Sequence, residues 1–385
     1  MLNSVQRTSA PWRIGVLFSR TGFMSVIEET QYQGTLLAIE EINAAGGICG
    51  RELVAVSYDP GSDAAAYGLC AKRLMIEDEV STIFGCYTSS SRKAVLPVVE
   101  RLNGLLWYPT LYEGFEASPN VVYTGASPNQ NSLALCRFLM DTYGSRFYFV
   151  GSDYIYPRES NRVMREVLKA NGGSVVGERY VSVHARWQDF LPIVQDIKRL
   201  KPDVIFSTVV GEATVFLYQA YANVGLDPRK MPIASLTTTE AEIAAMGFDV
   251  GEGHITAASY FQGVESDAND SFVKRFKKRF GSDVSTNMCV EASYFQLHLF
   301  AKALEHANTL DTEVLRAMVL GATFEAPQGA VSVNPTTGHA DLWTRIGRAN
   351  SAGQFDIINQ SKEAVHADPF LIGYGRATAQ AGNAL

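Results

Sequence analysis

Hydroxyl-rich and aromatic clusters directly follow four of the strands that the sequence predicts. They are Tyr87–Ser91, Tyr108–Tyr112, Asp153–Arg158 and Leu236–Thr239. A hydroxyl group can both donate and accept a hydrogen bond, and an aromatic ring can cover the flat face of a small molecule. A primary amide offers one carbonyl acceptor and two N–H donors on a nearly apolar body. The clusters therefore favour a small, uncharged, amide-like ligand.

Other interpretations of the clusters make different demands. An amino acid needs a charged partner for its ammonium group and donors for its carboxylate, which Asp153 and the helix start at Ser89–Ser91 could supply. A sugar would need several carboxylates or amides, and the clusters contain few. In structural terms, Ser89–Ser91 and Thr237–Thr239 are typical helix N-caps, and Arg92 with Lys93 is typical of a solvated helix face. Because the clusters follow strands in two predicted lobes, the binding interpretation gains weight.

Signatures of catalysis, metals and cofactors are missing from the sequence. It contains no G-x-S-x-G, Walker or G-x-G-x-x-G motif, and its six histidines show no H-E-x-x-H or other close spacing. Ser89–Lys93 has the residue types of a serine–lysine amidohydrolase but lacks the surrounding glycine-rich run. We therefore expect a protein that is not an enzyme, with no metal and no cofactor.

Parallel sheets are the elements that must bring the clusters together. From Arg13 onward, β-rich runs alternate with helical patterns, which is typical of parallel sheets with crossover helices. The expected strands are 13–19, 52–59, 81–87, 105–109, 146–153, 174–183, 203–211, 231–237 and 254–261, and a hairpin-like end spans 330–347 and 354–359. The expected helices include 28–45, 64–78, 92–102, 270–280 and 289–307, and 120–131 reads as a loop. Ligands bind beyond the carboxyl ends of such strands.

The length of the chain predicts two lobes. At 385 residues it exceeds the size of one ordinary core, so we expect an α/β protein with two doubly wound parallel sheets. The first lobe is expected to contain residues 13–124 and 258–327, and the second residues 125–257 and 328–375. A three-segment hinge is expected near 123–128, 257–261 and 326–331, with flexible tails at 1–12 and 376–385.

Charge and cysteine usage bear on partners and compartment. The net charge is -7 with no basic block, which argues against nucleic acid and against an anionic membrane surface as direct partners. Five cysteines without a C-x-x-C pair favour reduced thiols, and residues 1–13 lack the apolar region of a secretory signal. We expect a cytoplasmic protein; a periplasmic or extracytoplasmic location is the alternative.

Several segments resemble a known family. Gly46–Tyr67 (GGICGRELVAVSYDPGSDAAAY) resembles the first-lobe signature of type I amino-acid and amide binding proteins. The segments that resemble the aliphatic amidase negative regulators are Gly85–Glu100, Tyr108–Asn131, Gly151–Asn161, Phe206–Gly211 and Ile233–Glu242. The related urea-transporter binding proteins share the YEG, YTGA-PNQ and GSDY patterns, but YIYPRESN at 154–161 is more similar to the regulators. The resemblance runs from about Ile14 to at least Gly329.

The resemblance implies the type I periplasmic-binding-protein fold, which is similar to that of leucine-binding proteins, with a ligand pocket between the lobes. The ligand-binding residues implied by position are Tyr87, Ser89, Tyr108, Thr110, Leu111, Tyr154, Tyr156, Thr208, Thr237 and Thr238. Leu111 stands where the relatives have proline, so this larger side chain would affect the size of the ligand.

A function and a partner also follow from the resemblance. It implies a sensor that binds a small amide such as acetamide, or urea, and holds an RNA-binding antiterminator of amidase or nitrile-metabolism genes inactive. The alternative is a receptor for urea, short amides or branched amino acids that feeds an ABC transporter. The sequence leaves the oligomeric state open, and a homo-oligomer is compatible with it.

Overall fold

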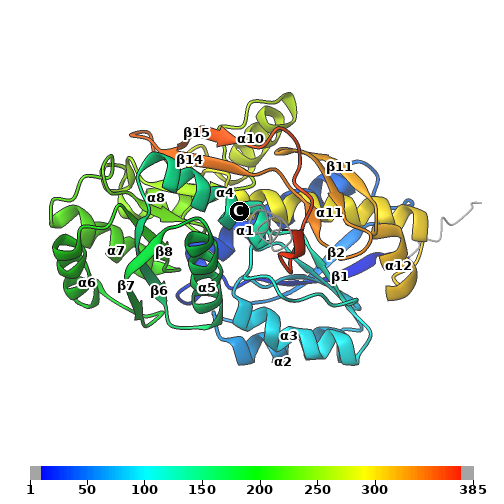
Figure 1. Cartoon of the computed structure of the whole chain (residues 1–385). Coiled ribbons are helices and arrows are strands. Elements are labelled where there is room, and N and C mark those ends of the chain that lie inside the picture. Colours follow the sequence, from blue (N-terminus) through cyan, green and yellow to red (C-terminus); the bar gives the residue numbers. More distant parts are fainter. Residues whose placement is uncertain (1–9, 374–385) are drawn as a thin grey trace, which may run out of the picture.

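The computed structural model describes residues 10–373 and divides into two halves, each built on a sheet of parallel strands (Figure 1). Most of the expected flexible tails, 1–12 and 376–385, lie outside the described residues. In Figure 1 the green segments form one half, while the blue, cyan and yellow segments form the other. The expected α/β fold with two parallel sheets is confirmed.

The first sheet is entirely parallel and has the strand order β2-β1-β3-β4-β5. Its strands are β1 (Trp12–Leu17), β2 (Leu53–Tyr58), β3 (Thr82–Gly85), β4 (Leu105–Tyr108) and β5 (Val121–Tyr123). The helices between them are α1 (Ser25–Ala44), α2 (Ala64–Ile76) and α3 (Ser89–Arg101). Both β3 and β4 are buried along their whole length, as expected of strands covered on both faces.

The second sheet has seven strands in the order β15-β14-β10-β9-β8-β6-β7. Its parallel strands are β6 (Arg146–Ser152), β7 (Ser174–Val181), β8 (Val204–Thr208), β9 (Ile233–Ser235) and β10 (Ile255–Ala258), and the antiparallel hairpin β14 (Arg345–Ala349) and β15 (Phe355–Gln360) extends it. Its helices are α4 (Pro128–Thr142), α5 (Ile155–Ala170), α6 (Trp187–Leu200), α7 (Glu212–Asn223), α8 (Glu240–Met246) and α9 (Phe248–Gly251).

Later segments of the chain return to the first sheet. They are α10 (Asp267–Phe280), α11 (Met288–Ala307), α12 (Thr312–Val319) and a small sheet of β11 (Thr323–Ala326), β12 (Gly329–Val333) and β13 (Ala340–Asp341). Helix α11 packs against α1, where the Tyr294 hydroxyl donates to Glu41 Oε2 at 2.7 Å. A Cβ atom on Gly34 of α1 would lie 2.4 Å from the carbonyl oxygen of Val290, so only glycine permits this close approach.

Two local expectations from the sequence are wrong. The stretch 120–131 is not a continuous loop, because it contains β5 and the first turn of α4. The third connection between the larger sheets lies later than the expected segment at 326–331. A parallel bridge joins His339 to Tyr123 of β5, so the chain still belongs beside the first sheet there and crosses between β13 and β14. The division into lobes by residue range remains a prediction.

A buried carboxyl group lies beside the end of β1. Glu28 of α1 accepts a hydrogen bond from the backbone N–H of Ser19 at 2.6 Å and another from the Tyr67 hydroxyl. Burial raises the pKa of Glu28 to about 8, although the hydrogen bonds from Ser19 and Tyr67 oppose this shift. The side chain is therefore largely protonated in the folded chain at neutral pH.

This carboxyl group predicts a pH-dependent stability difference between the wild type and Glu28→Gln. Between about pH 4.5 and 8 the unfolded chain releases the Glu28 proton and the folded chain keeps it, so rising pH lowers the stability of the wild type. Glutamine has no proton to release. Urea unfolding should show the free energy of unfolding of the variant rising relative to the wild type by at least about 1 kcal/mol between pH 5 and 7.5. A difference that does not change with pH would contradict this prediction.

Candidate functional site

A small cavity lies where strand ends of the two larger sheets meet. Its lining residues are Tyr87, Ser89, Thr110, Leu111, Tyr154, Tyr156, Val210 and Thr237. The first four follow β3 and β4 of the first sheet, and the others follow β6, β8 and β9 of the second. Ligands of open α/β sheets bind beyond the carboxyl ends of parallel strands, so the topology makes this cavity the candidate ligand site.

Local structure fixes the polar side chains around the cavity. Thr88 caps α3, its hydroxyl accepting from the Ser91 N–H at 3.0 Å, and this places Ser89 in the first turn of the helix. Thr110 Oγ1 donates to the Cys86 carbonyl oxygen at 3.3 Å and accepts from Gln31 Nε2 at 3.1 Å. These bonds hold both hydroxyl groups at the wall of the cavity.

Three phenol groups face the cavity from the two halves. Burial raises the pKa of Tyr87, Tyr154 and Tyr156, so each keeps its proton at neutral pH and can donate a hydrogen bond. The Oη atom of Tyr156 is buried, and among the described residues the nearby Ser160 hydroxyl does not reach hydrogen-bonding geometry with it. An unsatisfied buried hydroxyl costs free energy, so a ligand that accepts this hydrogen bond would stabilise the closed arrangement.

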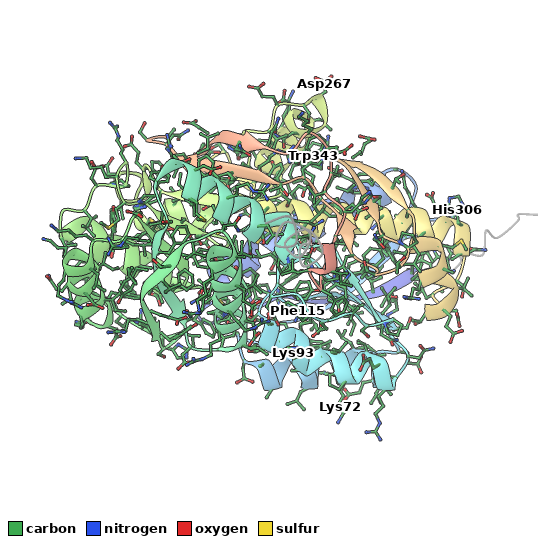
Figure 2. The ribbon with its side chains drawn as sticks, viewed as in Figure 1. Lys72, Lys93, Phe115, Asp267, His306 and Trp343 are labelled. Carbon is green, nitrogen blue, oxygen red and sulfur yellow. The ribbon has the colours of Figure 1, made fainter. Side chains whose placement is uncertain are left out.

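The two halves also contact each other outside the lining of the cavity. The ring of Phe23, which follows β1, packs edge-on against His184, which follows β7, with 5.1 Å between the ring centroids. On the loop after β4, Phe115 lies under the guanidinium group of Arg162 of α5 at 5.0 Å. Figure 2 labels Phe115 near the boundary between the halves. The structure thus has its two halves closed over the cavity.

The structure brings together seven of the ten residues expected from the sequence, and three do not line the cavity. Tyr108 is fully buried, and its hydroxyl donates to the Tyr87 carbonyl oxygen at 2.7 Å, so it supports the site from behind. Thr208 donates to Asn161 Oδ1 at 3.0 Å, and the hydroxyl of Thr238 is bonded to that of Tyr218. Sequence reasoning missed Val210, an aliphatic residue that carries no chemical signal of its own.

Two expectations about charged residues in the clusters also change. Arg92 is not on a solvated helix face; it is fully buried, with Nη2 lying 3.0 Å from Glu113 Oε1 and Nε 2.8 Å from Glu116 Oε1. Asp153, the expected partner of an amino-acid ammonium group, is about half exposed and pairs with Arg158 at 2.7 Å. It does not line the cavity, so this candidate partner of an ammonium group is missing from the site.

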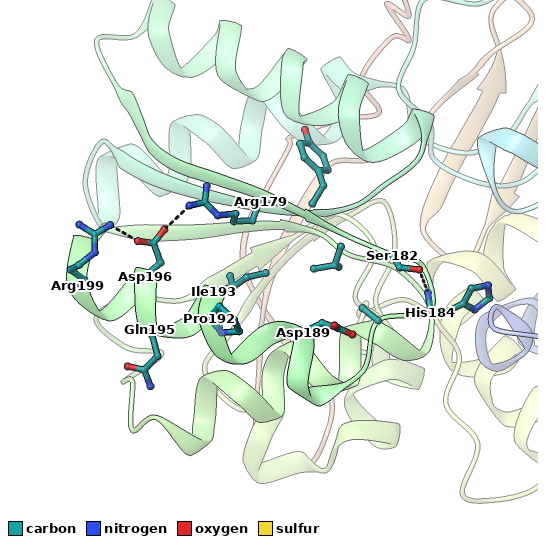
Figure 3. A pocket seen from close by; sticks show the side chains of 12 residues that line it. Arg179, Ser182, His184, Asp189, Pro192, Ile193, Gln195, Asp196 and Arg199 are labelled. Atoms are coloured by element: carbon teal, nitrogen blue, oxygen red, sulfur yellow. Dashed lines mark hydrogen bonds and ion pairs between the residues drawn. The ribbon is translucent and has the colours of Figure 1, made fainter.

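This cavity is much smaller than the hollow beside β7 and α6. Its volume is about 10 Å³, whereas a hollow beside the edge strand β7 and helix α6 measures about 750 Å³ (Figure 3). In that larger hollow the single carboxylate of Asp196 is paired with both Arg199 and Arg179. Drug-sized ligands occupy about 300–1,000 Å³. A space of about 10 Å³ holds about one water molecule, so the closed cavity admits a ligand of a few heavy atoms only if the side chains around it shift slightly.

Parallel strand ends that meet at a closed, hydroxyl-lined cavity define a two-lobed binding protein. The family model described as "Periplasmic binding protein domain" matches residues 12–374, and the chain belongs to this family. Members of this family are binding proteins.

Curated relatives agree over most of the chain. The Leu/Ile/Val-binding protein homolog 6 of Brucella abortus is 24% identical over 302 residues, which cover 76% of this chain and 77% of that protein. The leucine-, isoleucine-, valine-, threonine- and alanine-binding protein of Pseudomonas aeruginosa is 25% identical. The match covers 80% of this chain and 82% of that protein. Limonene hydroxylase of Geobacillus stearothermophilus is 30% identical, but the match covers only 33% of this chain and 23% of that protein.

Solved structures share the fold. A solute-binding protein of an ABC transporter from Rhodopseudomonas palustris, in complex with 3,4-dihydroxybenzoic acid, has a TM-score of 0.82 and 21% identity and covers 92% of this chain and 98% of its own. A branched-chain amino acid transporter substrate-binding protein from Streptococcus pneumoniae, in complex with isoleucine, has a TM-score of 0.80 and 18% identity. The match covers 91% of this chain and 99% of that protein. At these identities the likeness concerns the fold.

Two features bear on compartment. Among residues 10–373, no helix is both long enough and apolar enough to cross a membrane. The five cysteines, all in the described part of the chain, are free thiols. The family is named for periplasmic proteins, and the comparisons do not support the expected cytoplasmic location, which stays a prediction.

Proposed function

We propose that this protein is a solute-binding receptor that closes its two halves over one small, uncharged amide such as acetamide, or urea. The observation that carries the proposal is the cavity itself, in which phenol and hydroxyl groups from four strand ends surround a space of about 10 Å³. The tyrosine hydroxyls would donate to the carbonyl oxygen of the ligand, and serine or threonine oxygens would accept from its N–H groups. The names of relatives that bind solutes for ABC transporters support the receptor class.

Size and charge favour an amide over the ligands of the named relatives. Isoleucine or a dihydroxybenzoate has more than twice the heavy atoms of acetamide, so the closed cavity would have to widen more to admit either of them than to admit acetamide. Asp153 forms a salt bridge with Arg158 and does not line the cavity, so it does not offer its charge to an ammonium group there. A ligand with four heavy atoms gains at most about 6 kcal/mol, equivalent to a Kd of tens of micromolar, and only when fully buried. Closure of the two halves supplies that burial.

Isothermal titration calorimetry on the purified protein tests the proposal. We expect acetamide, propionamide or urea to bind with a Kd of roughly tens of micromolar. Leucine and 4-hydroxybenzoate should bind more weakly or not at all. Binding of leucine or the benzoate, with no heat from any amide or from urea, would contradict the proposal.

Ser89→Ala should weaken the binding of acetamide by about 1–3 kcal/mol, because an N–H group of the buried ligand would lose its acceptor. Ser91→Ala is the matched control. Ser91 lies in the same helical turn and is also buried, but its hydroxyl donates to the Thr88 carbonyl oxygen at 2.7 Å and does not line the cavity. Calorimetry on both variants should show a loss for the first only. Equal affinities for the two variants would place the ligand elsewhere.

A second candidate function is an amide sensor that acts on an RNA-binding antiterminator. It is favoured by the free thiols of all five cysteines, a state typical of reducing compartments. The sensor and the receptor would bind the same ligand and differ in their protein partner. Genes for a permease and an ATPase beside this gene would support the receptor. An adjacent antiterminator gene with an amidase or nitrile hydratase gene would support the sensor.

A further inference from the structure

The hydroxyl group of Ser89 donates its proton to a residue that does not line the cavity. Ser89 Oγ donates to Glu113 Oε2, and Glu113 is itself 4% exposed. The other carboxylate oxygen, Oε1, lies 3.0 Å from Nη2 of Arg92 in an ion pair. A carboxylate has acceptor sites only, so the single proton in the bond between Ser89 and Glu113 belongs to the serine. What Ser89 offers to the cavity is therefore a lone pair.

The buried guanidinium group of Arg92 holds Glu113 in this position. Arg92 lies one helical turn after Ser89 on α3, and its Nε donates to Glu116 Oε1 at 2.8 Å. Its guanidinium carbon lies 4.8 Å from the ring centre of Tyr108 and 4.7 Å from that of Tyr112. Arg92 Nη1 also lies 3.4 Å from Ser89 Oγ, and this guanidinium nitrogen can only donate a hydrogen bond to the serine. Arg92 therefore takes up one of the two lone pairs of Ser89, and the other lone pair remains for the ligand.

We propose that Glu113 is a positioning residue that makes the site select ligands carrying an N–H donor and reject carboxylates. This inference rests on the proposed function and names the basis of its selectivity. Acetamide and acetate have the same number of heavy atoms and nearly the same shape. The NH2 group of acetamide would donate to Ser89, whereas an oxygen of acetate would face the Ser89 lone pair with the Glu113 carboxylate behind it. The tyrosine hydroxyls would donate to the carbonyl oxygen of acetamide or to the second oxygen of acetate.

Calorimetry with acetamide and acetate on the full-length wild type, Glu113→Gln and Glu116→Gln tests this inference. The glutamine at 113 can donate its own N–H to Ser89, which frees the serine proton to point into the cavity. We expect Glu113→Gln to lose at least tenfold in acetamide affinity and to lower the ratio of acetamide to acetate affinity. Glu116 contacts the same arginine but not Ser89, so Glu116→Gln should leave that ratio within about twofold.

A double-mutant cycle separates positioning from a general structural effect. In the Ser89→Ala background, Glu113→Gln should change acetamide affinity by less than twofold, because the hydroxyl that it orients is gone. A further large loss in that background would overturn the inference. Wild-type protein that binds acetate as tightly as acetamide would overturn it without any variant.

The outcomes also distinguish this inference from the proposed function. If the wild type binds neither acetamide nor urea, the proposed function fails. If the wild type binds acetamide and Glu113→Gln behaves like Glu116→Gln, only the role of Glu113 fails. Near-ultraviolet circular dichroism at the titration temperature verifies that each variant is folded.

Discussion

Replacing Arg92 with methionine is expected to lower the free energy of unfolding by about 3–5 kcal/mol, because it leaves the buried carboxylate of Glu113 without its cation and leaves Glu116 with Lys93 alone. Glu113 and Glu116 both pair with this guanidinium group, which is fully buried. Methionine has a similar length but no charge and no donor. Urea unfolding at neutral pH measures the loss. Lys93→Met is the matched control, since Lys93 also pairs with Glu116 but is 41% exposed, and an exposed pair contributes about 0–1 kcal/mol.

The pH dependence gives a second check on Arg92. Burial raises the pKa of Glu116, but Arg92 and Lys93 outweigh this effect and lower the pKa to about 2. A carboxyl group whose pKa is lowered on folding stabilises the fold above its unfolded value of about 4.5, and that contribution is lost as the pH falls through about 2. The stability difference between the wild type and Arg92→Met should therefore narrow as the pH falls from 5 toward 2. A difference in the free energy of unfolding between the wild type and Arg92→Met of less than about 1 kcal/mol at pH 7 would contradict the prediction.

Leu111→Ala is expected to shift the preferred ligand from acetamide to longer amides. Leu111 lines the candidate site, and it also lines a second cavity of about 10 Å³ at the connections between the halves, together with Pro109, Ala258 and Cys289. Removing the leucine side chain would join the two spaces. Butyramide has two more methylene groups than acetamide, each worth about 0.8 kcal/mol when buried, so the ratio of butyramide to acetamide affinity should rise roughly 15-fold.

The control for Leu111→Ala must reproduce the general cost of truncating a buried leucine, which is about 2–5 kcal/mol of stability. Leu106→Ala does this, because Leu106 on β4 is fully buried and lines neither cavity. Calorimetry should show an unchanged ratio of the two amide affinities for that variant. The same ratio for Leu111→Ala as for the wild type would mean that this side chain does not set the length of the ligand.

Strands with a continuous apolar pattern could be predicted from the sequence almost to the residue. β4 (Leu105–Tyr108) and β6 (Arg146–Ser152) lie within the expected ranges, because a strand covered on both faces has few polar residues. β5 was missed, since it has only three residues and is surrounded by the turn-forming types Gly, Pro and Asn. The late third connection was missed because it depends on the bridge between Tyr123 and His339, which are 216 positions apart in the chain.

For the candidate site, too, positions after strands could be predicted from the sequence, whereas side-chain contacts between distant residues could not. Residues directly after strands, such as Ser89 and Tyr154, could be found because the carboxyl ends of parallel strands share an edge of the sheet. Tyr108 was also expected at the cavity but does not line it, and its hydroxyl donates to the Tyr87 carbonyl oxygen. The burial of Arg92 was not predicted because its partners lie 21 and 24 residues later, on a loop whose contact with α3 depends on the tertiary fold.

The close packing of α1 on α11 has a consequence for synthesis on the ribosome. Gly34 and Val290 are separated by 256 positions, so at about 5–20 residues per second roughly 10–50 s pass between the appearance of the two helices. During that interval the first sheet has been made, but the helix that covers α1 has not. The nascent chain must therefore carry exposed apolar surface for that time, which makes it a natural client for chaperones. Slowing translation before residue 288 should increase aggregation of the newly made protein.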